Sequence, residues 1–213
     1  TSAAGSMVSS TAVTASLASK LRDDAGNAKV LNAGVALASA TMFLRVMLLT
    51  AALAIFAAPH FVLIAAPGMV TSLAACWLIL RHDEAGSRQV EDGMKLRNPF
   101  DLAPAVLLMF LTMALTLAAR WVLEKFGNAG LATVLAISGS VDVDSAIITM
   151  GNLPAGTLTA RVAALVLALP VTLNTLFKTA TLVSIAGWRR SWPGAAAMLA
   201  SLIALGGGVL LVF

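Results

Sequence analysis

Long apolar segments constrain the fold of this chain more than any other feature. An α-helix needs about 20 apolar residues to cross the hydrocarbon core of a bilayer, and most of the segments reach that length. The runs are continuous and lack the two-residue alternation of barrel strands, which favours helices. The segments cover residues 2–19, 30–58, 61–80, 100–123, 130–150, 159–186 and 194–213. The sequence therefore predicts an all-α, polytopic membrane helix bundle of about seven spans, although residues 2–19 are short and Ser-rich for a full span.

Composition points to the same class of protein. Hydrophobic residues make up 59% of the chain, charged residues only 11%, and the mean hydropathy is +0.92. A soluble domain has about 25% charged residues, so the expected partner of this surface is a lipid bilayer. The net charge of +4 is typical of lysines and arginines in cytoplasmic loops, and nucleic acid is not an expected partner. The single cysteine, Cys76, excludes an internal disulfide.

The distribution of basic residues predicts an orientation. With alternating spans, one side of the membrane carries Lys20, Arg22, Lys29, Arg81, Arg88, Lys95, Arg97 and Arg161. The other side carries Arg120, Lys125, Arg189 and Arg190. Because cytoplasmic loops are enriched in lysine and arginine, the first side is expected to be cytoplasmic. This assignment also places the C-terminus in the cytoplasm and Thr1 on the outer side.

Polar residues recur inside the apolar segments at one spacing. Arg45 and Lys178, each inside an apolar run, are 133 residues apart, and the same step takes Thr41 to Asn174 and Ser9 to Asp142. A charge at the centre of a bilayer costs about 3 kcal/mol on insertion scales, so it is rarely kept without a partner or a task. The spacing predicts a duplicated membrane domain with a polar centre.

The duplication predicts how the chain is divided. Residues 1–80 form a first repeat, residues 81–98 a charged cytoplasmic linker, and residues 99–213 a second repeat. Under the mapping, residues 100–133 have no counterpart, so we expect the first span of the first repeat to precede Thr1 in the natural protein. Four crossings in each half would make the repeats parallel, whereas segments that turn back within the bilayer would make them inverted.

Hydroxyl and carboxyl residues predict a polar path between the repeats. Ser2, Ser6, Ser10 and Thr14 recur every four residues and share one helix face; the matching stripe is Ser138, Asp142, Ser145 and Thr149. Asp142 and Asp144 would point about 200° apart on a regular helix, so both face one cavity only if the helix is broken there. The expected lining is Ser9, Ser10, Thr11, Thr14, Asp142 and Asp144. Small-residue packing between helices is the competing explanation for the stripes.

Two cations are the expected counter-ions or gating groups of that path. Arg45 lies one helical turn from Thr41, and Lys178 lies one turn from Asn174, so each cation has a neutral hydrogen-bonding group beside it. The least costly arrangement pairs the cations with the carboxylates across the two halves. Lys178 is close enough to its span end for its stem to carry the charge to the interface instead.

Four motifs together resemble a known family. They are Val8-Ser9-Ser10-Thr11-Ala12-Val13-Thr14, Asn98-Pro99-Phe100, Ser138-Gly139-Ser140-Val141-Asp142-Val143-Asp144 and Asn174-Thr175-Leu176-Phe177-Lys178. The combination resembles the bacterial membrane family called domain of unknown function 4010, over essentially the whole chain. The resemblance implies a multi-pass protein of the bacterial inner membrane, joined in the natural protein to an N-terminal MgtC/SapB-type membrane domain. That association suggests magnesium or acid-stress physiology but assigns no substrate.

The function that these features predict is passage of a small ion or solute through a transporter or channel-like protein. The alternative is a non-transporting membrane module that binds or regulates a partner protein, with the buried charges as structural pairs. The sequence contains no G-x-S-x-G, H-E-x-x-H or P-loop signature, so we do not expect an enzyme. No cofactor or metal site is expected, because neither histidine has a partner at ligand spacing. Substrate, coupling, direction and oligomeric state, including a homo-oligomer, are left open.

Overall fold

A computed structural model describes residues 2–23, 26–81, 143–154 and 156–213, with a few positions between 121 and 135. In the first helix, side chains are described from Thr11 onward, except that of Ala12. The elements of this part are six α-helices, labelled α1, α2, α3, α5, α6 and α7, and no strand is found among these residues. The all-α class is therefore confirmed for the described part of the chain.

Four helices are long and apolar enough to cross a bilayer. They are α2 (Ala28–Leu53), α3 (Ala58–Arg81), α6 (Ala160–Ala186) and α7 (Trp188–Val212). At 1.5 Å per residue each is about 36–40 Å long, which exceeds the ~30 Å hydrocarbon core. α1 (Ser2–Asp23) has 22 residues, and α5 (Val143–Gly151) has nine and is too short to span. The chain is an integral membrane protein with several apolar helices. The expected span at residues 100–123 lies outside the described residues, apart from Trp121.

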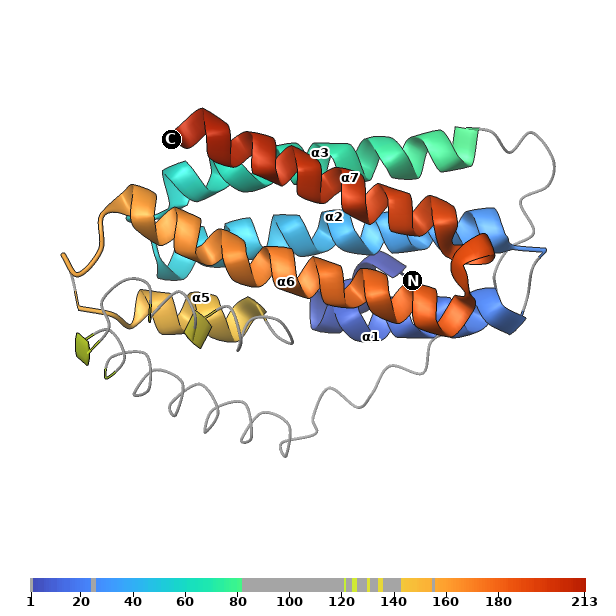
Figure 1. Cartoon of the computed structure of the whole chain (residues 1–213), viewed down its shortest axis with the longest axis horizontal. Coiled ribbons are helices and arrows are strands. Elements are labelled where there is room, and N and C mark those ends of the chain that lie inside the picture. The colour runs from blue at the N-terminus through green and yellow to red at the C-terminus, as the bar shows by residue number, and fades with distance from the viewer. Residues whose placement is uncertain are drawn as a thin grey trace.

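The spanning helices form two antiparallel hairpins. α2 and α3 are joined at residues 54–57, and α6 and α7 are joined at Gly187, which has the positive φ of +78° that glycine adopts readily. The two junctions lie at opposite ends of the bundle (Figure 1). α3 packs against α7, and further contacts join α3 to α6 and α2 to α7. α1 packs on α2, α6 and α7, whereas α5 packs on α2 and α6.

A polar layer divides the buried core into two apolar clusters. One cluster joins α1 to the end of α6 and the start of α7, and includes Leu21, Leu182 and Met198. The other joins α5 to the opposite halves of the long helices, and includes Phe61 and Ile147. In α6 the side chains between the two clusters are buried and polar: Asn174, Thr175, Lys178 and Thr179. The polar residues therefore lie inside the bundle and between its ends.

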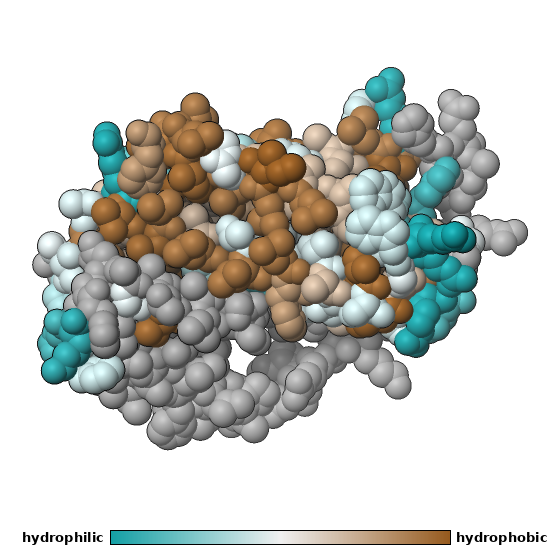
Figure 2. Space-filling view, viewed as in Figure 1, coloured by the Kyte–Doolittle hydropathy of each residue, from teal (hydrophilic) through white to brown (hydrophobic). Residues whose placement is uncertain are grey.

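Basic side chains gather at one end of the bundle, where Figure 2 shows hydrophilic residues on the right. The guanidinium of Arg190 donates a hydrogen bond to the carbonyl of Arg22, and Asn32 donates to the carbonyl of Arg190 at 2.9 Å. Arg81 ends α3 at this same end (Figure 1). We call it the cationic end, defined by Lys20, Arg22, Lys29, Arg81, Arg189 and Arg190.

One part of the sequence-based side assignment was therefore wrong. It separated Arg189 and Arg190 from Lys20 and Arg22, whereas the hydrogen bond from Arg190 joins the two groups. The physical reason is that α6 runs toward the cationic end and α7 starts there, so their junction meets the junction of α1 and α2 (Figure 1). Arg161, near the start of α6, lies at the far end instead.

A glycine contact fixes how closely α3 and α7 approach. A Cβ atom at Gly208 of α7 would lie 2.5 Å from the carbonyl oxygen of Ile64 in α3. Gly68 of α3 is similarly close to the carbonyl oxygen of Ser201 in α7, at 3.1 Å for a Cβ atom. Small residues allow such close backbone approach in membrane bundles, where dispersion contacts replace the hydrophobic driving force.

We expect Gly208→Ala to lower the free energy of unfolding by about 1–3 kcal/mol, because the methyl group would overlap backbone atoms that cannot rotate away. The matched control is Gly207→Ala on the same helix, since a Cβ atom there meets nothing within 4 Å. Unfolding measured by steric trapping in bicelles would compare the two variants. Equal stabilities would contradict the packing described for α3 and α7.

Candidate functional site

An ion pair inside the bundle joins the two halves of the chain. The guanidinium of Arg45, on α2, donates through Nε to Oδ1 of Asp144, on α5, at 3.2 Å, and Nη2 contacts Oδ2. Two parallel contacts of this kind form the bidentate geometry that suits arginine and carboxylate. The side chains are only 21% and 22% exposed, so the pair is largely removed from solvent. The expected pairing of a cation of one half with a carboxylate of the other is thus present.

The position of Asp144 in α5 favours its negative charge. α5 begins at Val143, so Asp144 lies in the first turn of the helix. Unpaired N–H groups and the helix dipole make this end partially positive, which stabilises a nearby carboxylate. α5 then runs alongside the second half of α2, until Gly151 contacts the backbone of Leu53. The ion pair therefore forms where the short helix starts.

Lys178 is the second cation of the site and is almost wholly buried. Its residue is 1% exposed, and it lies on α6 in the polar layer. α6 packs on α5, the helix that carries Asp144. Burial of this extent argues against snorkelling, the alternative in which the stem carries the charge to the interface. Arg45, Asp144 and Lys178 form what we call the charged cluster.

The two cations occupy matching positions on antiparallel helices. Arg45 lies eight residues before the end of α2 at Leu53, and Lys178 lies eight residues before the end of α6 at Ala186. Each is therefore about 12 Å from one end of its helix. The two helix ends lie at opposite ends of the bundle (Figure 1), so Arg45 and Lys178 are at equivalent depths measured from opposite ends.

The neutral residues predicted beside the cations differ in their contacts. Thr41 donates its hydroxyl to the carbonyl of Leu37 at 2.9 Å, which is the usual bond of a threonine within a helix. Asn174 is 3% exposed and lies one turn from Lys178. Thr14 is buried on α1, and Thr11 is partly buried on the same helix. The roles of these residues in a path stay predictions.

Part of the predicted path lies outside the described residues. Asp142 precedes the described start of α5, so its position is not described. The backbone of Ser9 and Ser10 lies in α1, but the structure does not describe the side chains of these two residues.

Sequence reasoning missed a structural asparagine at the cationic end. The amide of Asn32 donates to the carbonyl of Arg190 at 2.9 Å and accepts from the N–H of Gly194 at 3.0 Å. An uninterrupted α-helix would join those two backbone groups to each other. A Cβ atom at Gly194 would lie 2.7 Å from the amide oxygen, so a larger residue there would force the Asn32 side chain to shift. The available sequence signals were an asparagine in an apolar run and, far away in the chain, the Pro193-Gly194 pair.

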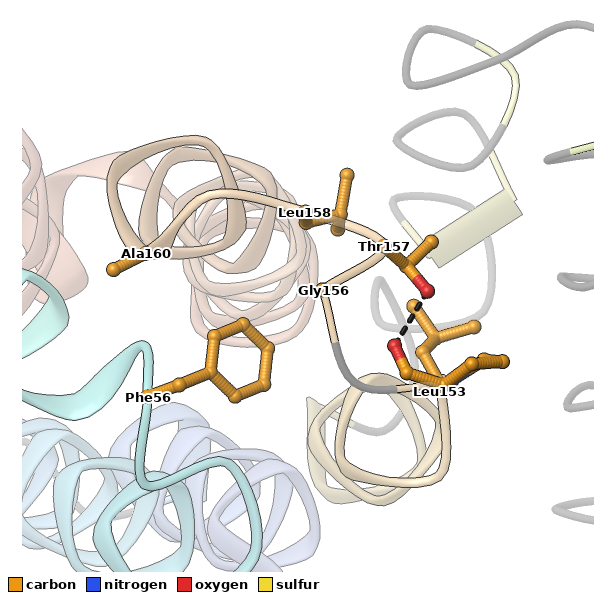
Figure 3. A pocket seen from close by; sticks show the side chains of 7 residues that line it. Phe56, Leu153, Gly156, Thr157, Leu158 and Ala160 are labelled. Carbon is orange, nitrogen blue, oxygen red and sulfur yellow. Dashed lines mark hydrogen bonds between the residues drawn. The ribbon is translucent and has the colours of Figure 1, made fainter.

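A pocket of about 230 Å³ lies away from the charged cluster, where α5 is joined to α6 (Figure 3). Its walls include Phe56, Leu153 and Leu158, and Figure 3 shows the hydroxyl of Thr157 bonded within the loop to the carbonyl of Pro154. Apolar walls of this kind offer no charged group to bind an ion. The charged cluster is therefore the better candidate site.

The charged cluster is poorly suited to a divalent metal. Within the described ranges, no three His, Cys, Asp or Glu residues gather closely enough to hold a metal ion. A magnesium ion prefers several oxygen ligands, whereas here Asp144 already pairs with Arg45, and Lys178 adds a second positive charge. The chemistry that the arrangement supports is charge pairing and exchange within a membrane.

Fold and site together define the class: a polytopic α-helical membrane protein with an ionic cluster inside its bundle. The chain belongs to the family described as domain of unknown function 4010, whose model matches residues 1–187. This confirms the family that the four sequence motifs resemble. Comparison with curated proteins and with solved structures gave no match.

We expect a double-mutant cycle of Arg45→Ala and Asp144→Asn to give a coupling energy of about 1–3 kcal/mol, because each single change leaves a charge in a poorly solvated site. The exposed pair of Arg22 and Asp23, at 3.1 Å, is the matched control, with a coupling of about 0–1 kcal/mol. Unfolding in bicelles would measure both cycles. A coupling for Arg45 and Asp144 no larger than that of the exposed pair would contradict the described geometry.

Proposed function

We propose that this chain is a transporter or channel-like membrane protein for a small ion or solute, with its polar site between two repeats. The observation that carries the proposal is the charged cluster, in which α2, α5 and α6 bring Arg45, Asp144 and Lys178 into one interior region. Ionisable groups are costly inside a membrane and typically mark a substrate or ion pathway. The family description assigns no activity, so the proposal rests on this site.

We also propose that the two halves are repeats of inverted orientation. The 133-residue step maps α2 onto residues 161–186 and residues 58–80 of α3 onto residues 191–213, which nearly coincide with α6 and α7. Exchanging each helix for its counterpart (α1 for α5, α2 for α6 and α3 for α7) reproduces the packing. The contact of α1 with α6 corresponds to that of α5 with α2, and the contact of α3 with α6 corresponds to that of α7 with α2. The mapped helices run in opposite directions (Figure 1), which supports a two-fold axis in the membrane plane and not one along its normal.

The contact of Gly68 with Ser201 supports this symmetry. These two positions are themselves 133 residues apart, so they are equivalent in the two halves. Equivalent residues can touch only near the symmetry axis. The proposed axis therefore passes between α3 and α7, close to the middle of the bundle.

The mechanism that we propose is an exchange of partners by Asp144. α5, which carries Asp144, packs against both α2 and α6, and these helices carry Arg45 and Lys178. In inverted-repeat transporters one half rocks against the other around a central site. Such rocking would shift the carboxylate between the two cations, so that a neutral or ionic solute passes while one charge pair replaces another.

The non-transporting alternative also has an observation in its favour. The Arg45–Asp144 pair is bidentate in form and joins α2 to the short α5, which is the arrangement expected of a structural clamp. In that case the chain would be a module that binds or regulates a partner protein.

Location and partners follow as further proposals. We propose a bacterial inner-membrane protein with the cationic end in the cytoplasm, because lysine and arginine concentrate on that side. α7 runs away from the cationic end, so Phe213 would lie on the outer side; this replaces the sequence-based expectation of a cytoplasmic C-terminus. An N-terminal MgtC/SapB-type domain and a homo-oligomer are partners that the proposal can accommodate.

We expect Asp144→Asn to abolish flux of the transported solute in proteoliposomes, because the exchange of partners needs the carboxylate charge. A panel of ions and small solutes would be screened with the unaltered protein by fluorescent indicators. Asp23→Asn, which neutralises an exposed carboxylate at the cationic end, is the matched control and should retain flux. No flux of any panel member through correctly folded protein would overturn the transport proposal in favour of the clamp.

We expect a cysteine at Arg189 to be protected from a membrane-impermeant maleimide in spheroplasts, whereas one at Asn152 reacts. Both positions are exposed, and they lie at opposite ends of the bundle. The background would carry Cys76→Ala, and permeabilised cells would give the maximum labelling of each site. The reverse pattern would place the C-terminus in the cytoplasm.

A further inference from the structure

We propose that Ser39, Ser72 and Ser201 bind an internal water molecule where α2, α3 and α7 meet in the middle of the bundle. This site is separate from the charged cluster. Ser39 and Arg45 are both on α2, but six residues apart, which turns their side chains about 120° from each other.

Two buried hydroxyls provide the first observation. Ser39 is 1% exposed and Ser72 is 0% exposed, and neither hydroxyl has a hydrogen-bond partner among the residues that the structure describes. Other hydroxyls in the same helices bond to the carbonyl four residues earlier, as those of Thr50 and Thr71 do. A buried hydroxyl without a partner loses its hydration at a cost of about 1–3 kcal/mol. A small ligand that can both donate and accept hydrogen bonds would therefore satisfy the two serine hydroxyls.

The register of the first hairpin brings these serines together. The ring of Phe43 on α2 lies against Gly68 on α3. Moving one turn toward the cationic end from this contact reaches Ser39 on α2 and Ser72 on α3, because the two helices are antiparallel. Each serine shares a helix face with the residue that makes the contact. The two hydroxyls consequently face each other across the hairpin.

The register of α7 adds the third serine. Asn32 on α2 bonds to Gly194 on α7, and two helices that run side by side in the same direction advance together. Seven residues further along, which is about two turns and the same face, α2 reaches Ser39 and α7 reaches Ser201. Gly68 approaches the backbone of Ser201 from the third helix. The three serines thus converge from three helices.

The chemistry of the site favours water over an ion. A bound water needs about two to four hydrogen-bonding partners, which three hydroxyls can supply. The hydroxyl of Ser201 already donates to the carbonyl of Met198 at 2.7 Å, so its oxygen remains able to accept from a water. Calcium, by comparison, takes about six to eight oxygen ligands, and the backbone carbonyls of unbroken helices are already engaged.

A water at this site would connect the two halves of the chain. Ser39 and Ser72 belong to the first half and Ser201 to the second. The water would also lie beside the contact of Gly68 on α3 with the backbone of Ser201 on α7. Water can exchange its hydrogen bonds as helices slide, so the site would satisfy the serines without locking α7 to the hairpin.

X-ray radiolytic footprinting of the full chain in detergent tests this proposal, because radiolysis of a bound water creates hydroxyl radicals that oxidise adjacent side chains. Phe43, one turn from the serines, is the reporter. Phe61 is the matched control, because it is equally buried at 0% exposure and belongs to the same apolar cluster as Phe43. We expect oxidation of Phe43 to be several-fold faster than that of Phe61, as measured by mass spectrometry. In the variant with both Ser39→Ala and Ser72→Ala, we expect this excess to be lost.

Two outcomes would overturn the water site. Equal oxidation rates of Phe43 and Phe61 in the unaltered protein would mean that no water is present beside the serines. Fast oxidation of Phe43 that persists in the double variant would mean that the serines do not hold the water. A rise in the oxidation of Phe61 would also report misfolding of the double variant. Whether a water is present at all is decided by comparing Phe43 with Phe61 in the unaltered protein, which needs no substitution.

Discussion

A charge inside a membrane must be neutralised by another part of the same protein, and this constraint organises the interior of the bundle. Arg45 cannot reach bulk water easily from α2, and the described geometry supplies Asp144 at the first turn of α5 as its partner. A helix of nine residues gains little from its own backbone hydrogen bonds. The ion pair and the packing of α5 on α2 and α6 therefore stabilise each other.

The polar layer has a second consequence for packing. Membrane helices associate through close contact and hydrogen bonds, since lipid tails are as apolar as leucine. Glycine contacts between α3 and α7 supply the close approach, and Asn32 supplies hydrogen bonds between α2 and α7. These glycine contacts and hydrogen bonds hold the two hairpins together. The charged cluster and the buried serines therefore lie between helices that are in close contact at the two glycines and at Asn32.

The sequence predicted the helical class and about seven spans, of which four coincide with the long apolar helices of the described residues. It also singled out Arg45 and Lys178, because each is visible as a charge within a long apolar run. It did not identify Asn32, Ser39 or Ser72. A small neutral polar residue in an apolar helix usually bonds to its own backbone, so its sequence context is the same whether or not it contacts another helix. The side assignment of Arg189 and Arg190 failed because it depended on counting crossings through residues 82–142.

Local physical chemistry is what the sequence by itself determined. Apolar length, the absence of alternation and the positions of isolated charges follow from the cost of placing polar groups in hydrocarbon, and they need no knowledge of neighbours. Only the tertiary structure decided that Asp144 pairs with Arg45, that α2 and α6 run in opposite directions, and that the side chains of Ser39 and Ser72 are buried. The reason is that helix register and direction depend on contacts between separate helices, such as that of Arg45 with Asp144, 99 residues apart, which no local pattern encodes.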